Sequence, residues 1–334
     1  MTFLSDKALE RLRGSEAPDL SGTRYKVRNL VARGGMGAVY AAEDEKLFRR
    51  VALKVLDTPD ANGNLSSRLM REARVLAQLE HPGIVPVHDV GVLPDGRVYY
   101  TMKFVEGLRL DQYITRLDSL PQRLRLFLRL CDAVAFAHSR GVVHRDLKPA
   151  NVMVGSFGEV LVVDWGLAKI LRDDDRTLDE TALISSRKPE TENDSTQSSV
   201  ITGHGTVMGT PGYMSPEQAR GETERIDAHS DIFSLGALLK FIALGRGQRK
   251  SVALPRPLLA ICAKAMAESP NARYASVSEL AIELSRYMDG LTVSAYSENA
   301  LERLARFYKR HQVAILLITA YLIMRALVLF FFHR

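Results

Sequence analysis

The segment Val142–Val154, "VVHRDLKPANVMV", places charged and amide side chains between two short runs of β-branched apolar residues. Such runs are typical of half-buried strands, so the residues between them are expected to form a short loop. The polar side chains on this loop belong to His144, Arg145, Asp146, Lys148 and Asn151. The loop therefore holds charges of both signs close together, and their purpose has to come from the rest of the sequence.

Length and composition limit what can surround this loop. A chain of 334 residues is longer than one hydrophobic core usually supports, so two lobes or domains are expected. The two cysteines, Cys131 and Cys262, each lie in an apolar, helix-like run, which favours buried reduced thiols over a disulfide or a metal pair. The net charge is +6, but the basic residues lack interleaved aromatic side chains, so no nucleic-acid partner is expected.

Strand patterns dominate the sequence before the loop. Residues 25–40 predict two strands around "ARGGMG", residues 50–56 a third strand, and residues 66–79 a helix. The stretch "VLPDGRVYYTM" predicts a hairpin with its turn at Pro94, Asp95 and Gly96. After "VEG" at residues 105–107 the pattern becomes mostly helical. The sequence therefore predicts an α+β chain with a β-rich lobe, a hinge and an α-rich lobe.

Two features of the β-rich half suggest an anion site. The stretch "VARGGMGAVY" has three glycines in four positions, which lets the backbone approach a phosphate, although a tight hairpin needs similar residues. The stretch "VALK" places Lys54 in an apolar strand, where the ammonium either reaches the surface or pairs with an acid. Glu72, on the helix that follows, is the candidate partner.

An acidic side chain also leaves a strand after the loop. Asp164, in "VVDWG", lies thirteen residues beyond Asn151. With Asp146, these residues give two carboxylates and an amide at the ends of strands. Such oxygen ligands can hold a divalent metal ion, as the phosphates of a nucleotide require.

In order and spacing, these motifs resemble the signature of eukaryotic-type serine/threonine protein kinases of the membrane-anchored bacterial kind, over residues 25–290. The resemblance implies a bilobal protein-kinase-like fold, with an N-lobe of residues 25–104 and a C-lobe of residues 108–290. It implies transfer of the γ-phosphoryl group of ATP, with Mg²⁺ or Mn²⁺, to Ser or Thr hydroxyls of proteins. The chain's own activation segment would be one substrate, phosphorylated in trans within a dimer.

By position, the resemblance implies the roles of individual side chains. Asp146 would accept the proton of the substrate hydroxyl, and Lys148 would neutralise the transferred group. The catalytic residues are Asp146, Lys148, Asn151 and Thr210. The nucleotide-binding residues are Val31, Gly34, Gly35, Gly37, Val39, Ala52, Lys54, Glu72 and Met102. The metal ligands are Asn151 and Asp164.

The resemblance also implies supporting contacts outside the cleft. Glu217 would pair with Arg273, and Asp231 would brace the catalytic loop. Arg145 would receive an activating phosphate, carried by Thr202 or Thr206 before "GTPGYMSPE". From Arg172 to Thr202 the chain carries an insert rich in Asp, Glu, Ser and Thr, which is either a passive disordered loop or a cluster of autophosphorylation sites.

Three departures from the kinase pattern keep alternatives open. Ala32 replaces the first glycine of the loop, Trp165 replaces the usual phenylalanine, and only 26 residues separate Asp231 from Leu258, too few for the helix that usually docks substrates. A membrane-tethered scaffold without transfer activity is therefore the competing interpretation. A small-molecule phosphotransferase is disfavoured by "DLKPAN" and "GTPGYMSPE".

The two ends of the chain differ in character. Residues 1–24 lack the apolar core of a signal peptide. Residues 313–332 contain one charge, Arg325, and are long enough to cross a bilayer, although a buried helix is the alternative. The segment 291–312 before this span is basic, which places the kinase domain in the cytoplasm. Only His333 and Arg334 follow, so no domain is expected on the far side.

Overall fold

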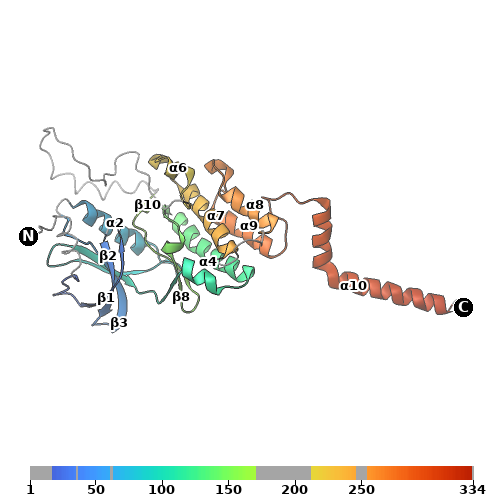
Figure 1. Cartoon of the computed structure of the whole chain (residues 1–334), viewed down its shortest axis with the longest axis horizontal. Coiled ribbons are helices and arrows are strands. Elements are labelled where there is room, and N and C mark those ends of the chain that lie inside the picture. Colours follow the sequence, from blue (N-terminus) through green and yellow to red (C-terminus); the bar gives the residue numbers. More distant parts are fainter. Residues whose placement is uncertain (1–16, 35–36, 61–62, 171–211, 246–253, 333–334) are drawn as a thin grey trace, which may run out of the picture.

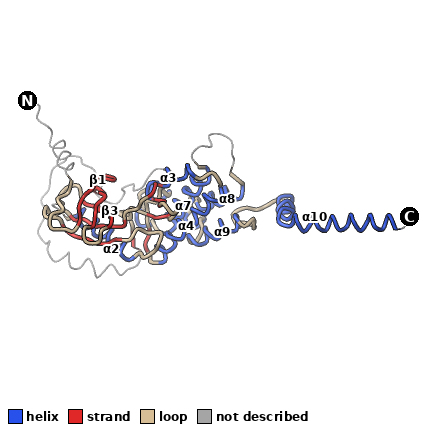
Figure 2. The backbone as a smooth tube through the Cα atoms, turned by 90° about the horizontal axis from the view of Figure 1, so that it is seen from below, coloured by secondary structure: helices blue, strands red, loops and turns tan. Residues whose placement is uncertain are grey.

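The computed structural model describes residues 17–34, 37–60, 63–170, 212–245 and 254–332. Two lobes lie side by side, with strands gathered in one and helices in the other (Figure 1). A long C-terminal helix extends away from both lobes, as the turned view confirms (Figure 2). The predicted order of a β-rich half followed by an α-rich half is therefore confirmed.

The N-lobe is one antiparallel sheet in the order β1-β2-β3-β5-β4. Its strands are β1 (Tyr25–Gly34), β2 (Gly37–Asp44), β3 (Arg49–Val55), β4 (Val87–Val92) and β5 (Val98–Lys103). The helix α2 (Asn64–Gln78) packs on β4 and β5. Its buried residues recur at the helical spacing expected for one buried face: Leu69, Glu72, Ala73, Val75 and Leu76.

The register of the sheet separates its two faces. Val39 and Tyr100 both lie opposite Lys54, and Met102 lies opposite Ala52. Because side chains alternate along a strand, these five residues share the face that carries Lys54. The opposite face packs into a separate apolar cluster that includes Tyr25, Tyr40, Val51, Leu53 and Tyr99.

The C-lobe consists mainly of helices around α4 (Leu120–Ser139), which packs against α7 (Ala228–Leu244) and α9 (Val277–Met288). Two small sheets face the N-lobe. They are built from β6 (Gly107–Arg109), β8 (Val152–Gly155) and β9 (Val160–Val162), and from β7 (Val142–Val143) with β10 (Lys169–Ile170). The remaining short elements are α3 (Leu110–Tyr113), α6 (Pro216–Ala219), α8 (Arg256–Ala265) and turns of 3-10 helix at Ile114–Arg116, Pro149–Asn151, Thr223–Arg225 and Pro270–Ala272.

The core of the C-lobe continues beneath α2 as one apolar cluster, which runs from Leu69 and Tyr100 to Leu235 and Leu280. Both cysteines are buried free thiols, as expected, and burial raises the pKa of Cys262 to about 12. Helix α7 ends at Leu244 and α8 begins at Arg256. The described residues between them, 245, 254 and 255, form no helix.

The last helix, α10 (Ala300–Phe332), has one non-helical residue, His311, which divides it into two arms. Figure 1 shows the arms meeting at a sharp angle. The second arm includes His311–Leu329, 19 residues with a mean hydropathy of 2.1 and no share buried against the protein. By length and composition this arm could cross a membrane, over nearly the residues that the sequence predicted.

Candidate active site

A buried ion pair links the sheet to α2. Lys54 Nζ donates to Glu72 Oε1 at 2.7 Å and Oε2 at 2.8 Å, and it lies 3.3 Å from Asp164 Oδ1. Glu72 is 2% exposed and Lys54 is 8% exposed. The lysine is therefore held by two carboxylates from distant segments, which answers the choice between a surface lysine and a paired one.

Glu72 accepts a third hydrogen bond, from a second residue. The Tyr100 hydroxyl donates to Glu72 Oε1 at 2.9 Å, from the strand position directly opposite Lys54. Sequence reasoning missed Tyr100, because its role depends on the register between β3 and β5. Burial raises the pKa of Tyr100 and the adjacent Glu72 charge raises it further, so the hydroxyl stays a donor.

The charges around Lys54 reinforce one another. Burial alone would lower the pKa of Lys54, but Glu72 and Asp164 outweigh it and raise that pKa. Burial would raise the pKa of Asp164, whereas the charges of Lys54, His144 and Lys148 lower it. Both groups are therefore ionised at neutral pH. The Asp164 side chain is 49% exposed, which leaves its carboxylate open to a ligand.

Two glycines of the glycine-rich stretch lie at the end of β1 and the start of β2. Gly34 and Gly37 pair across this hairpin. Gly37 has φ +144°, and a Cβ there would lie 2.2 Å from the Val55 carbonyl oxygen, so only glycine fits. Val31 lies at an irregularity of β1 and is 51% exposed. Gly35 is outside the described residues.

The catalytic loop gathers its polar groups around Asp146, which is 8% exposed. Lys148 Nζ donates to Asp146 Oδ2 at 2.7 Å. Asn151 Nδ2 donates to the Asp146 main-chain oxygen at 2.8 Å and to Oδ2 at 3.1 Å. The structure therefore brings together three of the four predicted catalytic residues. Thr210, the fourth, is outside the described residues.

Asp231 fixes the start of this loop from α7. Its carboxylate accepts the backbone N–H groups of His144 and Arg145, each at 2.8 Å, as expected from the sequence. His138 Nε2 lies 2.8 Å from the same carboxylate, a contact without a sequence signal. Burial would raise the pKa of Asp231, but the hydrogen bond and charge of His138 lower it. Arg145 is held in a left-handed conformation, with φ 72°.

Arg145 has an unusual environment. Its Nε is buried and has no hydrogen-bond partner within the described part of the chain. Burial lowers the pKa of its guanidinium; the Asp231 charge opposes this effect, and the Arg71 charge on α2 adds to it. The charge of Arg71 therefore acts on Arg145 next to the catalytic loop, and sequence reasoning had identified only Arg145.

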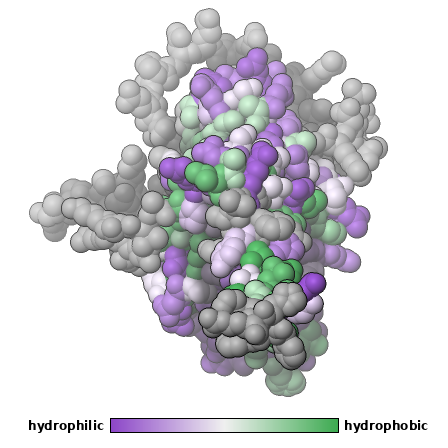
Figure 3. All heavy atoms as spheres, turned by 90° about the vertical axis from the view of Figure 1, so that its right-hand side faces the viewer, coloured by the Kyte–Doolittle hydropathy of each residue, from purple (hydrophilic) through white to green (hydrophobic). Residues whose placement is uncertain are grey.

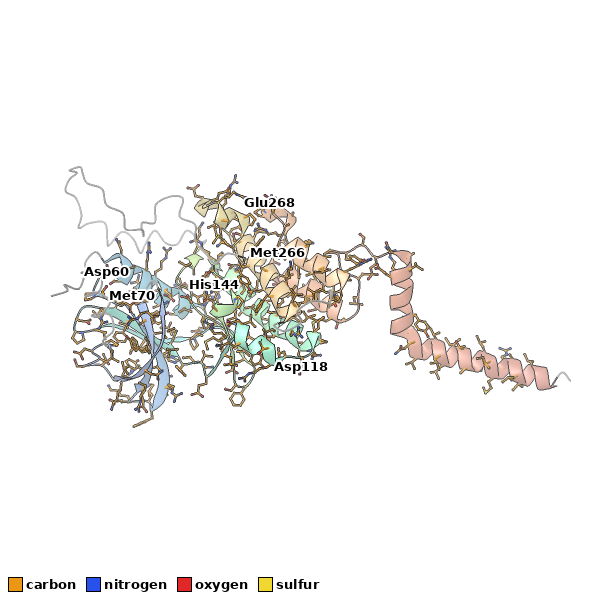
Figure 4. The ribbon with its side chains drawn as sticks, viewed as in Figure 1. Asp60, Met70, Asp118, His144, Met266 and Glu268 are labelled. Atoms are coloured by element: carbon orange, nitrogen blue, oxygen red, sulfur yellow. The ribbon has the colours of Figure 1, made fainter. Side chains whose placement is uncertain are left out.

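Trp165 follows Asp164 into the core. Its indole N–H donates to the Val162 carbonyl at 3.3 Å, and its ring lies 4.6 Å from the His144 ring. Trp165 is 1% exposed and belongs to the same apolar cluster as Leu69 and Leu76 of α2. Figure 4 places His144 at the junction of the two lobes. Asp164 itself has φ 62°, a left-handed backbone conformation that is uncommon for a non-glycine residue.

The expected support deeper in the C-lobe is present. Arg273 Nη1 and Nη2 donate to Glu217 Oε1 and Oε2 at 2.7 and 2.8 Å, and Ser230 Oγ donates to Oε1 at 2.7 Å. Burial would raise the pKa of Glu217, but these hydrogen bonds lower it to about 2. The pair joins α6, α7 and the turn at Pro270–Ala272.

The donor set suits a magnesium ion shared with phosphates. Asn151 uses its Nδ2 toward Asp146, and within the described residues nothing donates to its Oδ1. Asp164 supplies a half-exposed, ionised carboxylate. No group of three His, Cys, Asp or Glu residues that could hold a metal occurs in the described ranges. One carboxylate and one amide match Mg²⁺, which takes few protein ligands and completes its shell with phosphates and water.

A sequence model described as "Protein kinase domain" matches residues 25–250 of this chain. Relatives include "Serine/threonine-protein kinase PknD" of Chlamydia felis, 34% identical over 302 residues, with 80% of this chain and 31% of the relative covered. PknD of Protochlamydia amoebophila is 35% identical over 309 residues, with 80% of this chain and 30% of the relative covered. This chain thus spans about a third of the length of these curated relatives.

Among solved structures, the Mycobacterium tuberculosis PknI kinase domain is similar to this chain, with a TM-score of 0.54 and 24% identity over 81% of this chain and 99% of that domain. At this identity the likeness concerns the fold. The predicted bilobal fold is therefore confirmed.

Proposed function

Because the chain belongs to the protein kinase domain family, we propose that it transfers the γ-phosphoryl group of ATP to Ser and Thr hydroxyls of proteins. Relatives named serine/threonine-protein kinases support this specificity, as does the "DLKPAN" stretch. The relatives are longer and contain regions that this chain does not match. The proposal therefore concerns only the domain of residues 25–290.

One observation carries the proposal. Lys54 contacts Glu72 at 2.7 Å and Asp164 at 3.3 Å, so the pair that positions phosphates and the proposed metal ligand are in place together. Phosphoryl transfer by protein kinases requires both arrangements at once. A scaffold would not need a buried lysine shared between two carboxylates, because burying such charges carries a desolvation cost.

The remaining side chains have proposed roles around this pair. The Asp146 carboxylate would accept the proton of the attacking hydroxyl, and Lys148, 2.7 Å from it, would offset the charge of the transferred group. The cleft face of the sheet, with Val39, Ala52 and Met102, would hold the adenine. Asn151 and Asp164 would hold Mg²⁺, or Mn²⁺ in its place, which would supply positive charge to the phosphate oxygens when bound.

We also propose that α10 anchors the chain in a membrane with the kinase domain in the cytoplasm. The apolar arm His311–Leu329 supports the span, and the four basic residues before it support the orientation. These residues are Arg303, Arg306, Lys309 and Arg310.

The competing function is a membrane-tethered scaffold, favoured by the short connection between α7 and α8. Incubation of the detergent-solubilised full chain with labelled ATP and Mg²⁺ separates the two functions. We expect phosphate on the chain and on an added protein substrate, with a loss of at least ~10²-fold in Asp146→Asn and in Asp164→Asn. Absence of incorporation by the wild-type chain, folded as judged by circular dichroism, would refute the kinase proposal.

A further inference from the structure

The first arm of α10, Ala300–His311, is distinct from the apolar arm that follows it. His311 has φ −113° and ψ 16°, so the helical path breaks where the apolar stretch begins. Figure 1 shows the first arm turned sharply away from the direction of the second arm. If the second arm runs along a bilayer normal, the first arm turns toward the bilayer surface.

The first arm presents different chemistry on opposite sides. Leu301 and Tyr308 are 79% and 58% exposed, and they are seven residues apart, so they lie on the same face of the helix. Arg303 is exposed and, two positions after Leu301, lies about 200° around the helix. Figure 3, viewed from the side where α10 projects, shows a patch of hydrophobic residues among mostly hydrophilic ones at this end of the molecule.

The folded domain holds this arm in place. The Asn299 backbone N–H donates to Glu302 Oε2 at 3.1 Å, and the Tyr296 hydroxyl donates to Glu302 Oε1 at 3.0 Å. Arg256, at the start of α8, lies 3.7 Å from Glu302. Upstream, Val293 is buried in the C-lobe core and Ser294 bonds to Glu283 of α9. The first arm therefore continues from residues 291–299, here called the strap, which contact the C-lobe through Val293 and Ser294.

We propose that Ala300–His311 lies in the headgroup layer of an anionic phospholipid bilayer, with Leu301 and Tyr308 toward the acyl chains and Arg303 toward the phosphates. Exposed apolar and basic side chains on opposite faces fit such an interface, where each basic residue also gains from negative lipids. The inference rests on the proposed membrane span and goes beyond it, because it assigns a second lipid contact and fixes which side of the C-lobe faces the bilayer.

Quenching of tryptophan emission by brominated lipids tests the proposal in the full chain. Three variants are reconstituted separately in nanodiscs containing anionic lipid: Tyr308→Trp reports on the first arm, Leu322→Trp on the span, and Ile282→Trp on an exposed site of α9. The native Trp165 is buried, so its emission gives the unquenched background and a check of folding. We expect loss of the added emission for Tyr308→Trp and Leu322→Trp, and none for Ile282→Trp.

The outcomes separate this inference from the span. Quenching of Leu322→Trp without quenching of Tyr308→Trp overturns the inference and leaves the anchor intact. Quenching of neither overturns both. If the tryptophan of Tyr308→Trp is protected from the brominated lipids and the chains cross-link to each other, the first arm contacts a second copy of the chain. That outcome also overturns the inference. Leu301→Trp repeats the measurement on the same face in case Tyr308→Trp fails to fold.

A charge reversal at Arg303 provides the second part of the test. Adding Arg303→Glu to Tyr308→Trp reverses one charge, and at about fivefold per basic residue it should lower the equilibrium for surface binding by about 25-fold. The emission loss at 308 should then fall, while Arg303→Lys should preserve it. Quenching that is unchanged by Arg303→Glu, and equal in zwitterionic lipid, would exclude the proposed phosphate contact.

Discussion

The Glu72 carboxylate is a buried acceptor of three hydrogen bonds at the candidate site. It accepts two bonds from Lys54 and one from Tyr100 while only 2% exposed. Hydrogen bonds from Lys54 and Tyr100 hold this buried carboxylate in one position. They therefore also hold α2, the helix that carries Glu72, against the sheet. The consequence is that Tyr100, which the kinase resemblance does not include, contributes to the placement of Lys54.

Tyr100→Phe is expected to lower phosphoryl transfer about 10-fold, because a hydrogen bond to a charged group contributes roughly 1.5 kcal/mol or more. Lys54→Met should abolish transfer. Steady-state kinetics at varied ATP provides the measurement. Tyr99→Phe is the matched control, since Tyr99 faces the other side of the sheet and belongs to the separate N-lobe cluster. Equal losses in Tyr99→Phe and Tyr100→Phe would show that the hydroxyl of Tyr100 has no special role.

Trp165, the only tryptophan in the sequence, should report nucleotide binding. It follows Asp164 directly and contacts the His144 ring, so ordering of Asp164 by Mg-ATP should change its emission. We expect a saturable change with Mg-ATP, a much smaller change when a chelator is present, and none in Lys54→Ala. A flat fluorescence signal together with no heat in titration calorimetry would count against the nucleotide-binding roles of Gly34, Gly37, Lys54 and Asp164.

Among the secondary-structure elements, the C-lobe is joined by one buried ion pair. Glu217 of α6 and Arg273, which follows the turn at Pro270–Ala272, are 1% and 4% exposed, and Ser230 of α7 bonds to the same carboxylate. The α6 and α7 helices and the more distant segment at Arg273 therefore share one carboxylate. Removing a single partner of such a pair leaves the other charge buried and unpaired.

Glu217→Gln should destabilise the fold by about 3 kcal/mol at pH 7. The pKa of Glu217 is lowered from 4.5 to about 2 in the folded chain, so its contribution is complete above pH 4.5 and is lost as pH falls toward 2. The difference between wild type and Glu217→Gln should therefore shrink below pH 4.5. Denaturant unfolding followed by Trp165 emission measures it.

Glu222→Gln is the control for that experiment, because its pairs with Arg220 and Arg225 are at the surface. Surface pairs contribute little to stability. A Glu217→Gln variant that unfolds at the wild-type denaturant concentration at pH 7 would contradict the assigned role of the pair.

The activation segment provides a prediction about a charge partner for Arg145. Thr202 and Thr206 are outside the described residues, but Arg145 presents a buried Nε without a hydrogen-bond partner in the described structure, and Arg71 lies near it. A phosphate there would give the Arg145 guanidinium an anionic partner. Mass spectrometry should find phosphate on Thr202 or Thr206, and Thr202→Ala with Thr206→Ala should lower activity.

Two controls accompany the activation experiment. Ser198→Ala with Ser199→Ala, in the acidic insert, should leave activity near wild type. Arg145→Gln should make the phosphorylated and unphosphorylated chains equally active, because the proposed receiving cation is lost. Full activity of the double threonine variant would refute activation at these sites.

For the molecule as a whole, the cleft and the C-terminal arm are separate parts joined by the strap at residues 291–299. In the described part of α10, no share of the apolar arm is buried against the protein. The kinase domain therefore has no packing reason to depend on the arm, and among the described residues its two core clusters end at Tyr296.

Deletion of residues 313–334 should give a soluble chain that keeps its phosphoryl-transfer rate. Fractionation and a kinase assay in the same buffer measure both properties. The full-length chain should instead remain with membranes after washing with high salt and carbonate. Full-length protein in the soluble fraction would refute the span and leave Arg325 as part of a buried helix in some assembly.

Much of this architecture follows from local patterns in the sequence. The β-branched and aromatic residues at 98–101, the helical spacing of Leu69, Ala73 and Leu76, and the turn at Pro94 to Gly96 each depend on a few neighbouring residues. Backbone sterics and burial of one face act over that range, so strands, helices and most site residues were predictable. The order of motifs then identified the pairs Lys54–Glu72 and Glu217–Arg273 in advance.

The remaining contacts depend on how distant segments pack. Tyr100 reaches Glu72 across 28 residues and His138 reaches Asp231 across 93, and no local pattern encodes either distance. Gly37 shows the same dependence on distant residues. A side chain at this position would collide with the Val55 carbonyl of the next strand, so the turn alone does not explain the glycine. Local preferences choose the elements, but strand register and lobe packing choose which side chains meet, because those depend on burying the whole apolar surface at once.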